Sequence, residues 1–210
     1  MNGFRTIRRE GNFELTVQKS RFIGQCFRAE TEQDAASCID AVRRRFYDAK
    51  HHCYAYCTGD GVMITRCSDD GEPSGTAGVP ILNVLRQKNL TNTVCVVTRY
   101  FGGILLGTGG LARAYSETAA GALDDSGISE IRVCAECRCS LNYPQWAKLE
   151  RMFRAECIDY IPQYTDAVTC SFRIDRTKYD QFRDRMRELT DGTLDIRLLS
   201  EGYYPADVTD

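Results

Sequence analysis

The stretch TVCVVTRYFGGILLGTGGLARAYS, residues 93–116, combines three patterns that decide the local fold. Its first six residues, TVCVVT, are each apolar or β-branched, which predicts a short buried strand. A helix is expected from about Thr108 to Asp125, and Gly127 ends it. Between strand and helix lie five glycines within nine positions: Gly102, Gly103, Gly107, Gly109 and Gly110. Because glycine weakens helices and strands, this concentration indicates positive φ angles, close approach of a ligand, or both.

The order of strand, glycine-rich loop and helix predicts an anion site. Free N–H groups and the helix dipole favour negative charge at a helix N-terminus. Residues 107–112, GTGGLA, match the GxGxxA dinucleotide fingerprint, but Asp124 and Asp125 fall at the helix end and not after a following strand. No lysine follows the last glycine, so the Walker pattern fails as well. Neither familiar nucleotide motif is therefore complete.

Two arginines flank the glycines and suggest a phosphate site of another kind. Arg99 comes just before the loop, and Arg113 falls in the first turn of the expected helix, where a cation opposes the dipole unless it faces an anion. The candidate anion-binding or RNA-binding residues are Arg99, Gly102, Gly103, Gly107, Thr108, Gly109, Gly110 and Arg113. The alternative is that the glycines only let the helix pack tightly on the sheet.

A second glycine-rich stretch, DDGEPSGTAGVPIL at residues 69–82, carries three acids in four positions. Ser74 is expected to cap a helix, and Asp69, Asp70 and Glu72 just before it would complement the helix dipole. The alternatives are a hard-metal site or an acid/base pair, although the spacing is not that of an EF-hand.

The two histidines, His51 and His52, are neighbours. Adjacent strand residues point to opposite faces, so at most one of them can line a shared site, and a structural role is the default interpretation. The sequence has no HExxH and no CxxC…CxxC pattern, which predicts no metal centre, and we expect no cofactor. No GxSxG elbow is present either, so catalytic residues stay unassigned.

Composition narrows the class of protein. Of 210 residues 43% are hydrophobic, enough for a core, and the formal net charge is −2. Residues 1–127 hold 15 basic and 14 acidic residues, and the remainder 12 and 15, so any RNA contact needs a local patch. No window approaches the ~18 apolar residues of a membrane span, and the N-terminus lacks the apolar region of a secretory signal. Eleven cysteines without such a signal predict reduced thiols in the cytoplasm.

Residue patterns place the other elements of the first part. The expected strands are Phe13–Gln18, Arg21–Arg28, Cys53–Thr58 and Val62–Cys67, with turns at Lys19–Ser20 and Gly59–Gly61. Thr31 is expected to cap a helix to about Tyr47, and Ser74 one to about Lys88.

The second part of the chain, from residue 128 on, has a different order of expected helices and strands. The expected elements are a strand at Ile131–Ser140, a helix at Tyr143–Ala155, strands at Ile158–Tyr164 and Val168–Ile174, a helix at Arg176–Leu189 and a strand at Leu194–Leu199. This βαββαβ order is that of a ferredoxin-like split βαβ unit. Trp146, Phe153 and Phe182 fit core periodicity. We therefore predict an α+β protein with domains at residues 1–127 and 128–210.

Four motifs resemble the signature of the IMPACT/YigZ family. They are KSRFIG (19–24), HHCYAY (51–56), SDDGEPSGTAGVPIL (68–82) and VVTRYFGGILLGTGGLARAYS (96–116). The resemblance covers essentially the whole chain. It implies an N-terminal β/α domain similar to the fold shared by a ribosomal small-subunit protein domain and a class of small-molecule kinases. It also implies a C-terminal domain similar to the ferredoxin-like last domain of elongation factor G.

The resemblance also implies a role in translation, because eukaryotic members of the family regulate it through the amino-acid-starvation kinase pathway. We therefore expect a non-catalytic, translation-associated protein of the cytoplasm that binds RNA, the ribosome or a ribosome-associated protein. Arg99, Tyr100, Phe101 and Arg113 together suit single-stranded RNA.

Two alternatives stay open. The first is an enzyme or binding protein for a small phosphorylated or nucleotide ligand, whose site would join residues 107–110 to Asp69, Asp70, Glu72 and one histidine. The second is a protein–protein adaptor, in which the glycine-rich block is only architecture.

Overall fold

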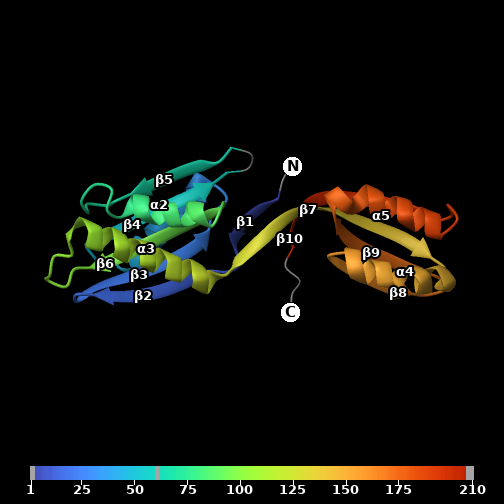
Figure 1. Ribbon diagram of the computed structural model, residues 1–210, viewed down its shortest axis with the longest axis horizontal. Coiled ribbons are helices and arrows are strands. Elements are labelled where there is room, and N and C mark those ends of the chain that lie inside the picture. Colours follow the sequence, from blue (N-terminus) through green and yellow to red (C-terminus); the bar gives the residue numbers. More distant parts are fainter. Residues whose placement is uncertain (1–2, 60–61, 207–210) are drawn as a thin grey trace. The chain divides into compact units, whose positions relative to one another are not determined.

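The computed structural model describes residues 3–59 and 62–206, and these form the α+β fold that the sequence predicts, with ten strands and five helices (Figure 1). The chain divides into two compact units. The N-terminal unit comprises Phe4–Ser129, and the C-terminal unit comprises Glu130 and the residues after it, together with Gly3.

The N-terminal unit is built on an antiparallel sheet with the strand order β2-β3-β6-β4-β5. The strands are β2 (Gly11–Val17), β3 (Ser20–Arg28), β6 (Thr93–Tyr100), β4 (His51–Thr58) and β5 (Ile64–Ser68), and a short strand, β1 (Phe4–Ile7), precedes them. The central strand is therefore β6, and it leads directly into the glycine-rich loop.

Helices cover both faces of this sheet. One core lies under α2 (Gly78–Gln87) and α3 (Gly107–Ser126), which Figure 1 shows side by side, and a second core lies under α1 (Glu32–Arg45). Alternation along β6 points Cys95 and Val97 to the first core and Val94 and Val96 to the second. The predicted buried strand is thus confirmed, and Arg99 falls on the side of α2 and α3.

Several boundaries follow the sequence and others differ. Thr31 caps α1 as predicted, in a capping box with Asp34. The first hairpin turns at Gln18 and Lys19, one position earlier than expected, and both residues have positive φ angles of 44° and 64°. The pairing of β4 with β5 confirms the second hairpin, although residues 60 and 61 of its predicted turn lie outside the described residues.

The C-terminal unit has the predicted βαββαβ order. Its elements are β7 (Ile128–Leu141), α4 (Tyr143–Glu156), β8 (Asp159–Tyr164), β9 (Val168–Asp175), α5 (Arg176–Leu189) and β10 (Ile196–Pro205). Pairing in the order β10-β7-β9-β8 is antiparallel throughout. Trp146, Phe153 and Phe182 are buried in one core with side chains from these strands, as predicted. The finer likeness of each unit to the folds named above stays a prediction.

All eleven cysteines are free thiols, and Cys67 is the one that is exposed. No helix within the described part of the chain is both long and apolar enough to cross a membrane.

Candidate functional site

Asp69 begins the acidic stretch and holds the start of α2. Its carboxylate accepts hydrogen bonds from the backbone N–H groups of Gly75, Ala77 and Gly78, at 2.8–2.9 Å. Burial raises the pKa of this carboxyl, but the three N–H donors lower it more, so the pKa lies below its usual value. The predicted cap at Ser74 is wrong, because α2 starts only at Gly78 and Ser74 is an exposed residue of the preceding loop.

Asp70 contacts both histidines, and its carboxylate binds the backbone of His52. Its carboxylate accepts from the backbone N–H of His52 at 2.7 Å and from Arg43 at 3.2 Å, and its carbonyl oxygen lies 2.8 Å from Nδ1 of His51. The His52 ring is buried and lies 3.1 Å from the carbonyl oxygen of Phe46, at the end of α1. His52 therefore belongs to the α1 side of the sheet and His51 to the other side.

Glu72 and Arg99 form a buried ion pair. An Arg99 guanidinium nitrogen lies 2.6 Å from Oε1 of Glu72, and both side chains are about 5% exposed or less. The Tyr115 hydroxyl donates to the same oxygen at 2.8 Å, and the Cys53 thiol lies 3.3 Å from the Tyr115 oxygen. Burial raises the pKa of Tyr115 above its ordinary range and that of Cys53 to about 12, so both stay protonated at neutral pH.

The Arg99 guanidinium also lies near two aromatic rings and one hydroxyl. Its central carbon is 5.4 Å from the ring centre of Phe22 and 5.5 Å from that of Phe101, within cation–π range. The Ser20 hydroxyl accepts from Arg99 at 3.4 Å and from the backbone N–H of Gly102 at 3.1 Å. Ser20 thus joins the buried pair to Gly102, the first glycine of the loop that follows β6.

The glycines of the loop have different reasons to be glycine. Gly103 and Gly107 have positive φ angles of 82° and 69°. A Cβ at Gly102 would lie 2.0 Å from the backbone of Lys19, and one at Gly110 would meet Leu106 at 3.2 Å. Gly109 has neither reason, because it is helical and a Cβ there would meet nothing within 4 Å.

The start of α3 has no cap. Leu106 occupies the N-cap position without a side-chain hydrogen bond, and the first turn has no acidic residue. The N–H groups at this end are therefore open to a ligand or to water. Arg113 is exposed and lies in the second turn, not the first as predicted. No ion pair among the described residues includes Arg113.

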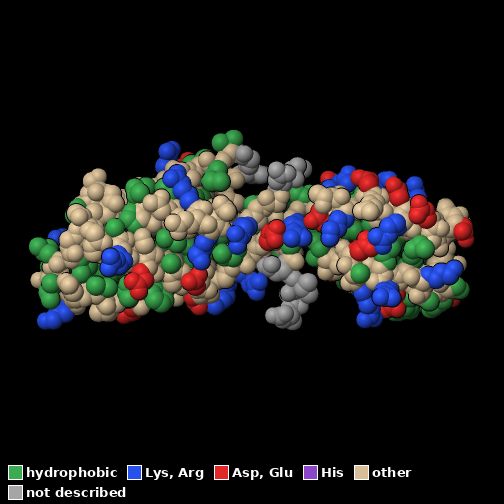
Figure 2. All heavy atoms as spheres, viewed as in Figure 1, with side chains coloured by type: hydrophobic (Ala, Val, Ile, Leu, Met, Phe, Trp, Pro, Cys, Tyr) green, Lys and Arg blue, Asp and Glu red, His purple; other side chains and the backbone are tan. Residues whose placement is uncertain are grey.

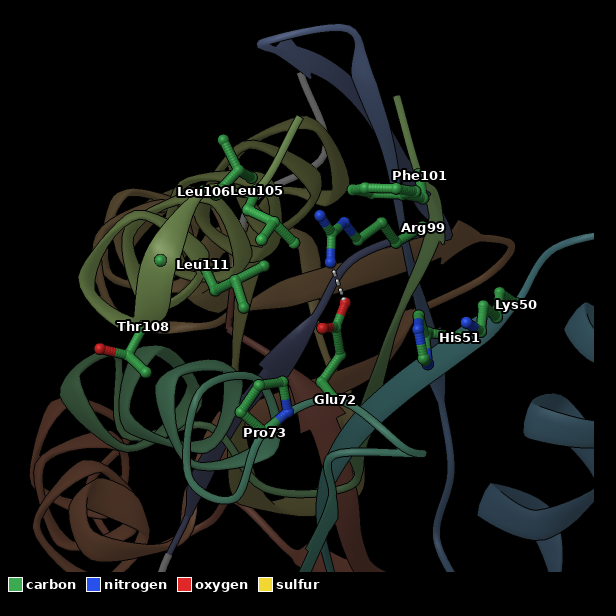
Figure 3. A pocket seen from close by; sticks show the side chains of 11 residues that line it. Lys50, His51, Glu72, Pro73, Arg99, Phe101, Leu105, Leu106, Thr108 and Leu111 are labelled. Carbon is green, nitrogen blue, oxygen red and sulfur yellow. Dashed lines mark hydrogen bonds and ion pairs between the residues drawn. The ribbon is translucent and has the colours of Figure 1, made fainter. Parts of the chain in front are cut away.

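A cavity of about 340 Å³ lies between the acidic loop and the start of α3 (Figure 3). It is lined by Lys50, His51, Glu72, Pro73, Arg99, Phe101, Leu105, Leu106, Gly107, Thr108 and Leu111. Figure 3 shows Arg99 and Glu72 facing each other at one wall, with the Phe101 ring beside the guanidinium and His51 on the other side of the pair. The cavity wall is thus apolar where the loop between β6 and α3 forms it, and polar where the start of β4 forms it.

The structure brings part of the predicted site together. Of the acids, Glu72 lines the cavity, whereas the carboxylates of Asp69 and Asp70 bind backbone and Arg43. Gly107 and Thr108 line it as well, and Arg113 does not. Within residues 3–59 and 62–206, no group of three or more His, Cys, Asp or Glu side chains is arranged to hold a metal ion.

Sequence reasoning missed four residues of this site with polar or ionisable side chains: Ser20, Lys50, Cys53 and Tyr115. Three of them lie within the motifs that carry the family resemblance, so their place in a motif could have pointed to them. The missing information was the direction of each side chain, which depends on strand register.

Fold and site together define the class: an α+β protein of two units whose N-terminal unit holds a cavity beside a glycine-rich loop. Residues 18–123 match the family model described as the Impact N-terminal domain, and residues 139–193 match a domain of unknown function, DUF1949. The chain belongs to the IMPACT family.

Two bacterial relatives match over most of the chain. The IMPACT family member YvyE of Bacillus subtilis is 37% identical over 198 residues, which is 94% of this chain and 91% of the relative. The IMPACT family member YigZ of Escherichia coli is 32% identical, covering 88% and 92%. A solved structure titled "Crystal structure of an hypothetical protein" is 28% identical, with a TM-score of 0.61 and coverage of 95% of this chain and 98% of the other.

Proposed function

We propose that this IMPACT family member is a translation-associated regulatory protein that binds single-stranded RNA at the cavity of its N-terminal unit. In this proposal a backbone phosphate lies against the first turn of α3, and the neighbouring base packs on the apolar wall. The family resemblance supports the link to translation, and the geometry supports the chemistry of the ligand.

Gly109 is the observation that carries the proposal. A glycine inside a helix costs roughly 1 kcal/mol relative to alanine. Neither backbone angle nor packing requires it at this position, since a Cβ would stand in open space. Close approach of a ligand to an uncapped helix start is the remaining physical reason, and phosphate suits the N–H groups there.

Gly109 itself does not line the cavity, but Gly107 and Thr108 of the same helical turn do, and other groups of the cavity match this ligand. Lys50 lines the same cavity and is exposed, which provides a cation at its rim, across the Glu72–Arg99 pair from the start of α3 (Figure 3). Phe101 is 50% exposed, although its ring also contacts Arg99, and it offers a face for stacking. Arg99 itself is neutralised by Glu72 and does not act as the phosphate ligand.

Any such contact has to be local. On the face shown in Figure 2, basic and acidic side chains are interspersed and form no broad stripe of one sign. A small site of this kind predicts weak, salt-dependent binding with few phosphate contacts.

Fluorescence anisotropy of a labelled single-stranded oligoribonucleotide tests the proposal in buffers of increasing salt. Lys50→Ala should weaken binding and reduce the salt slope by about 1. Gly109→Ala should weaken binding without loss of stability, because the added methyl group would stand in open space at the start of α3, where the proposal places the phosphate. Arg28→Ala is the matched control, since Arg28 lies at the other end of β3, roughly 20 Å along the strand from Phe22.

The proposal fails if the wild type shows no salt-dependent binding, or if Arg28→Ala weakens binding as much as Lys50→Ala.

A second candidate function is binding of a small phosphorylated ligand. The cavity volume of about 340 Å³ favours it, because this volume lies in the range of small-molecule sites. Tight binding of a mononucleotide with no gain from a longer strand would select this second function.

A further inference from the structure

The outer face of the C-terminal sheet carries a pair of arginines in an unusual position. Arg138 on β7 and Arg197 on β10 are direct cross-strand partners. Their neighbours Cys139 and Ile196 are also partners and are buried in the core of the unit, so alternation points the two arginines to the face away from that core.

Like charges directly opposite each other in a sheet are destabilising. Arg197 has one acidic partner, Asp195 at 3.2 Å, and both of these side chains are more than 70% exposed, so the pair contributes little. Arg138 donates only to the neutral hydroxyl of Ser171, at 3.2 Å, and none of the ion pairs of the described residues includes it. The pair therefore leaves a positive charge without compensation.

The next row along the same face shows the contrast. Arg173 forms an ion pair with Asp159 at 3.1 Å and stacks on the Tyr204 ring at 4.4 Å. Glu136 accepts from the Ser200 hydroxyl at 2.9 Å. This row holds one arginine and two carboxylates, so its positive charge is paired, whereas Arg138 in the neighbouring row has no ion pair of its own among the described residues.

A hollow of about 340 Å³ lies at these arginines. It is lined by Arg138, Cys139, Ser140, Thr169, Thr193, Asp195 and Arg197. Ser140 and Thr169 are cross-strand partners in the row beside the arginines, and their hydroxyls form no hydrogen bond with other described residues. Two guanidinium groups and two free hydroxyls thus line one small volume, together with the Asp195 carboxylate that pairs with Arg197.

We propose that this hollow is a second anion site, which binds a phosphate group between Arg138 and Arg197 with Ser140 and Thr169 as further donors. Guanidinium groups bind phosphate through two parallel hydrogen bonds, and a bound phosphate would offset the repulsion between the arginines. The phosphate belongs either to a free phosphorylated molecule or to a nucleic-acid backbone. The site is independent of the cavity in the N-terminal unit.

The test uses the full chain and inorganic pyrophosphate at low salt, with an oligoribonucleotide as the second ligand. Trp146 is the only tryptophan and lies in the C-terminal core, so its fluorescence follows unfolding of this unit. Pyrophosphate or the oligoribonucleotide should raise the midpoint of that transition. Arg138→Ala and Arg197→Ala should each weaken the binding about tenfold or more.

Arg151→Ala combined with Arg187→Ala is the matched control, because both arginines are exposed on the helices α4 and α5. This double variant should keep the ligand-induced shift. A merely structural role for Arg138 predicts that Arg138→Ala destabilises the unligated protein. The proposed site predicts no destabilisation, since the change removes a repulsion.

Response to pyrophosphate identifies a free phosphorylated ligand, and response to the oligoribonucleotide alone identifies the nucleic-acid backbone. Absence of both responses, or equal loss in the control variant, overturns the proposal. Lys50→Ala and Gly109→Ala leave the Trp146 response unchanged, which separates this site from the one proposed in the N-terminal unit.

Discussion

Replacement of Arg99 by methionine tests whether the Glu72–Arg99 pair is as buried as the contacts indicate. The change keeps the length of the side chain and removes its charge. Glu72 then stays about 4% exposed with the Tyr115 hydroxyl as its remaining partner. Removing one partner of a buried pair costs about 3–5 kcal/mol, because it leaves an uncompensated charge. In a unit of roughly 130 residues this lowers the unfolding midpoint by about 10–20 °C.

Urea unfolding followed by far-UV circular dichroism measures the free energy of unfolding. Trp146 fluorescence, recorded in the same samples, reports on the C-terminal unit and shows where the loss arises. Arg21→Met is the matched control, because Arg21 binds Glu14 through two bonds of 2.7 Å with both side chains about half exposed. An exposed pair contributes about 0–1 kcal/mol, so this variant should stay close to the wild type.

The double variant Glu72→Met with Arg99→Met removes both charges. It should be more stable than Arg99→Met alone, since replacing a whole buried pair by apolar side chains is often nearly neutral. A loss below about 1 kcal/mol for Arg99→Met, or a double variant less stable than the single one, would refute the reasoning.

Three further predictions concern stability and reactivity. Asp69→Ala should cost about 1–2 kcal/mol at pH 7 through loss of the α2 cap. Because the pKa of Asp69 is lowered in the folded state, this contribution is present above about pH 4 and disappears as the pH falls through the lowered pKa, which denaturation at several pH values measures. Gly102→Ala should lower the free energy of unfolding by about 1–3 kcal/mol, because its methyl group meets the Lys19 backbone. Gly109→Ala should raise it by up to about 1 kcal/mol, because alanine favours the helix and its methyl group meets nothing. Thermal melts of the two variants give both values. A thiol reagent should modify Cys67 quickly in the native protein and reach all eleven cysteines only after denaturation, since burial raises the pKa of thiols such as Cys139 and Cys170 to about 12.

Local patterns predicted most of the elements. Alternation and β-branched residues located β6, the capping residue Thr31 located the start of α1, and the aromatic periodicity of the second part located its core. These signals act between residues close in the chain, and backbone propensity and side-chain spacing determine them.

The errors about side-chain partners have one cause. The cap of α2 comes from Asp69, eight positions before Ala77, because the loop folds back on the helix start, and Ser74 in the usual place is not used. Arg99 finds its partner 27 positions away in Glu72, and Ser20 reaches Gly102 from another strand. Each contact depends on how the strands pair and on where the loops cross them.

The sequence by itself determined where the backbone can turn and where helices and strands begin, because glycine content, capping residues and hydrophobic period act locally. It also determined membership of the family, through motifs that stay in order along the chain. Only the tertiary structure decided which charges meet: Arg99 is neutralised by Glu72, Asp69 is used as a cap, and the start of α3 is left open. Hydrogen bonds and ion pairs require atoms within about 3–4 Å, and only the folded chain brings such distant residues that close.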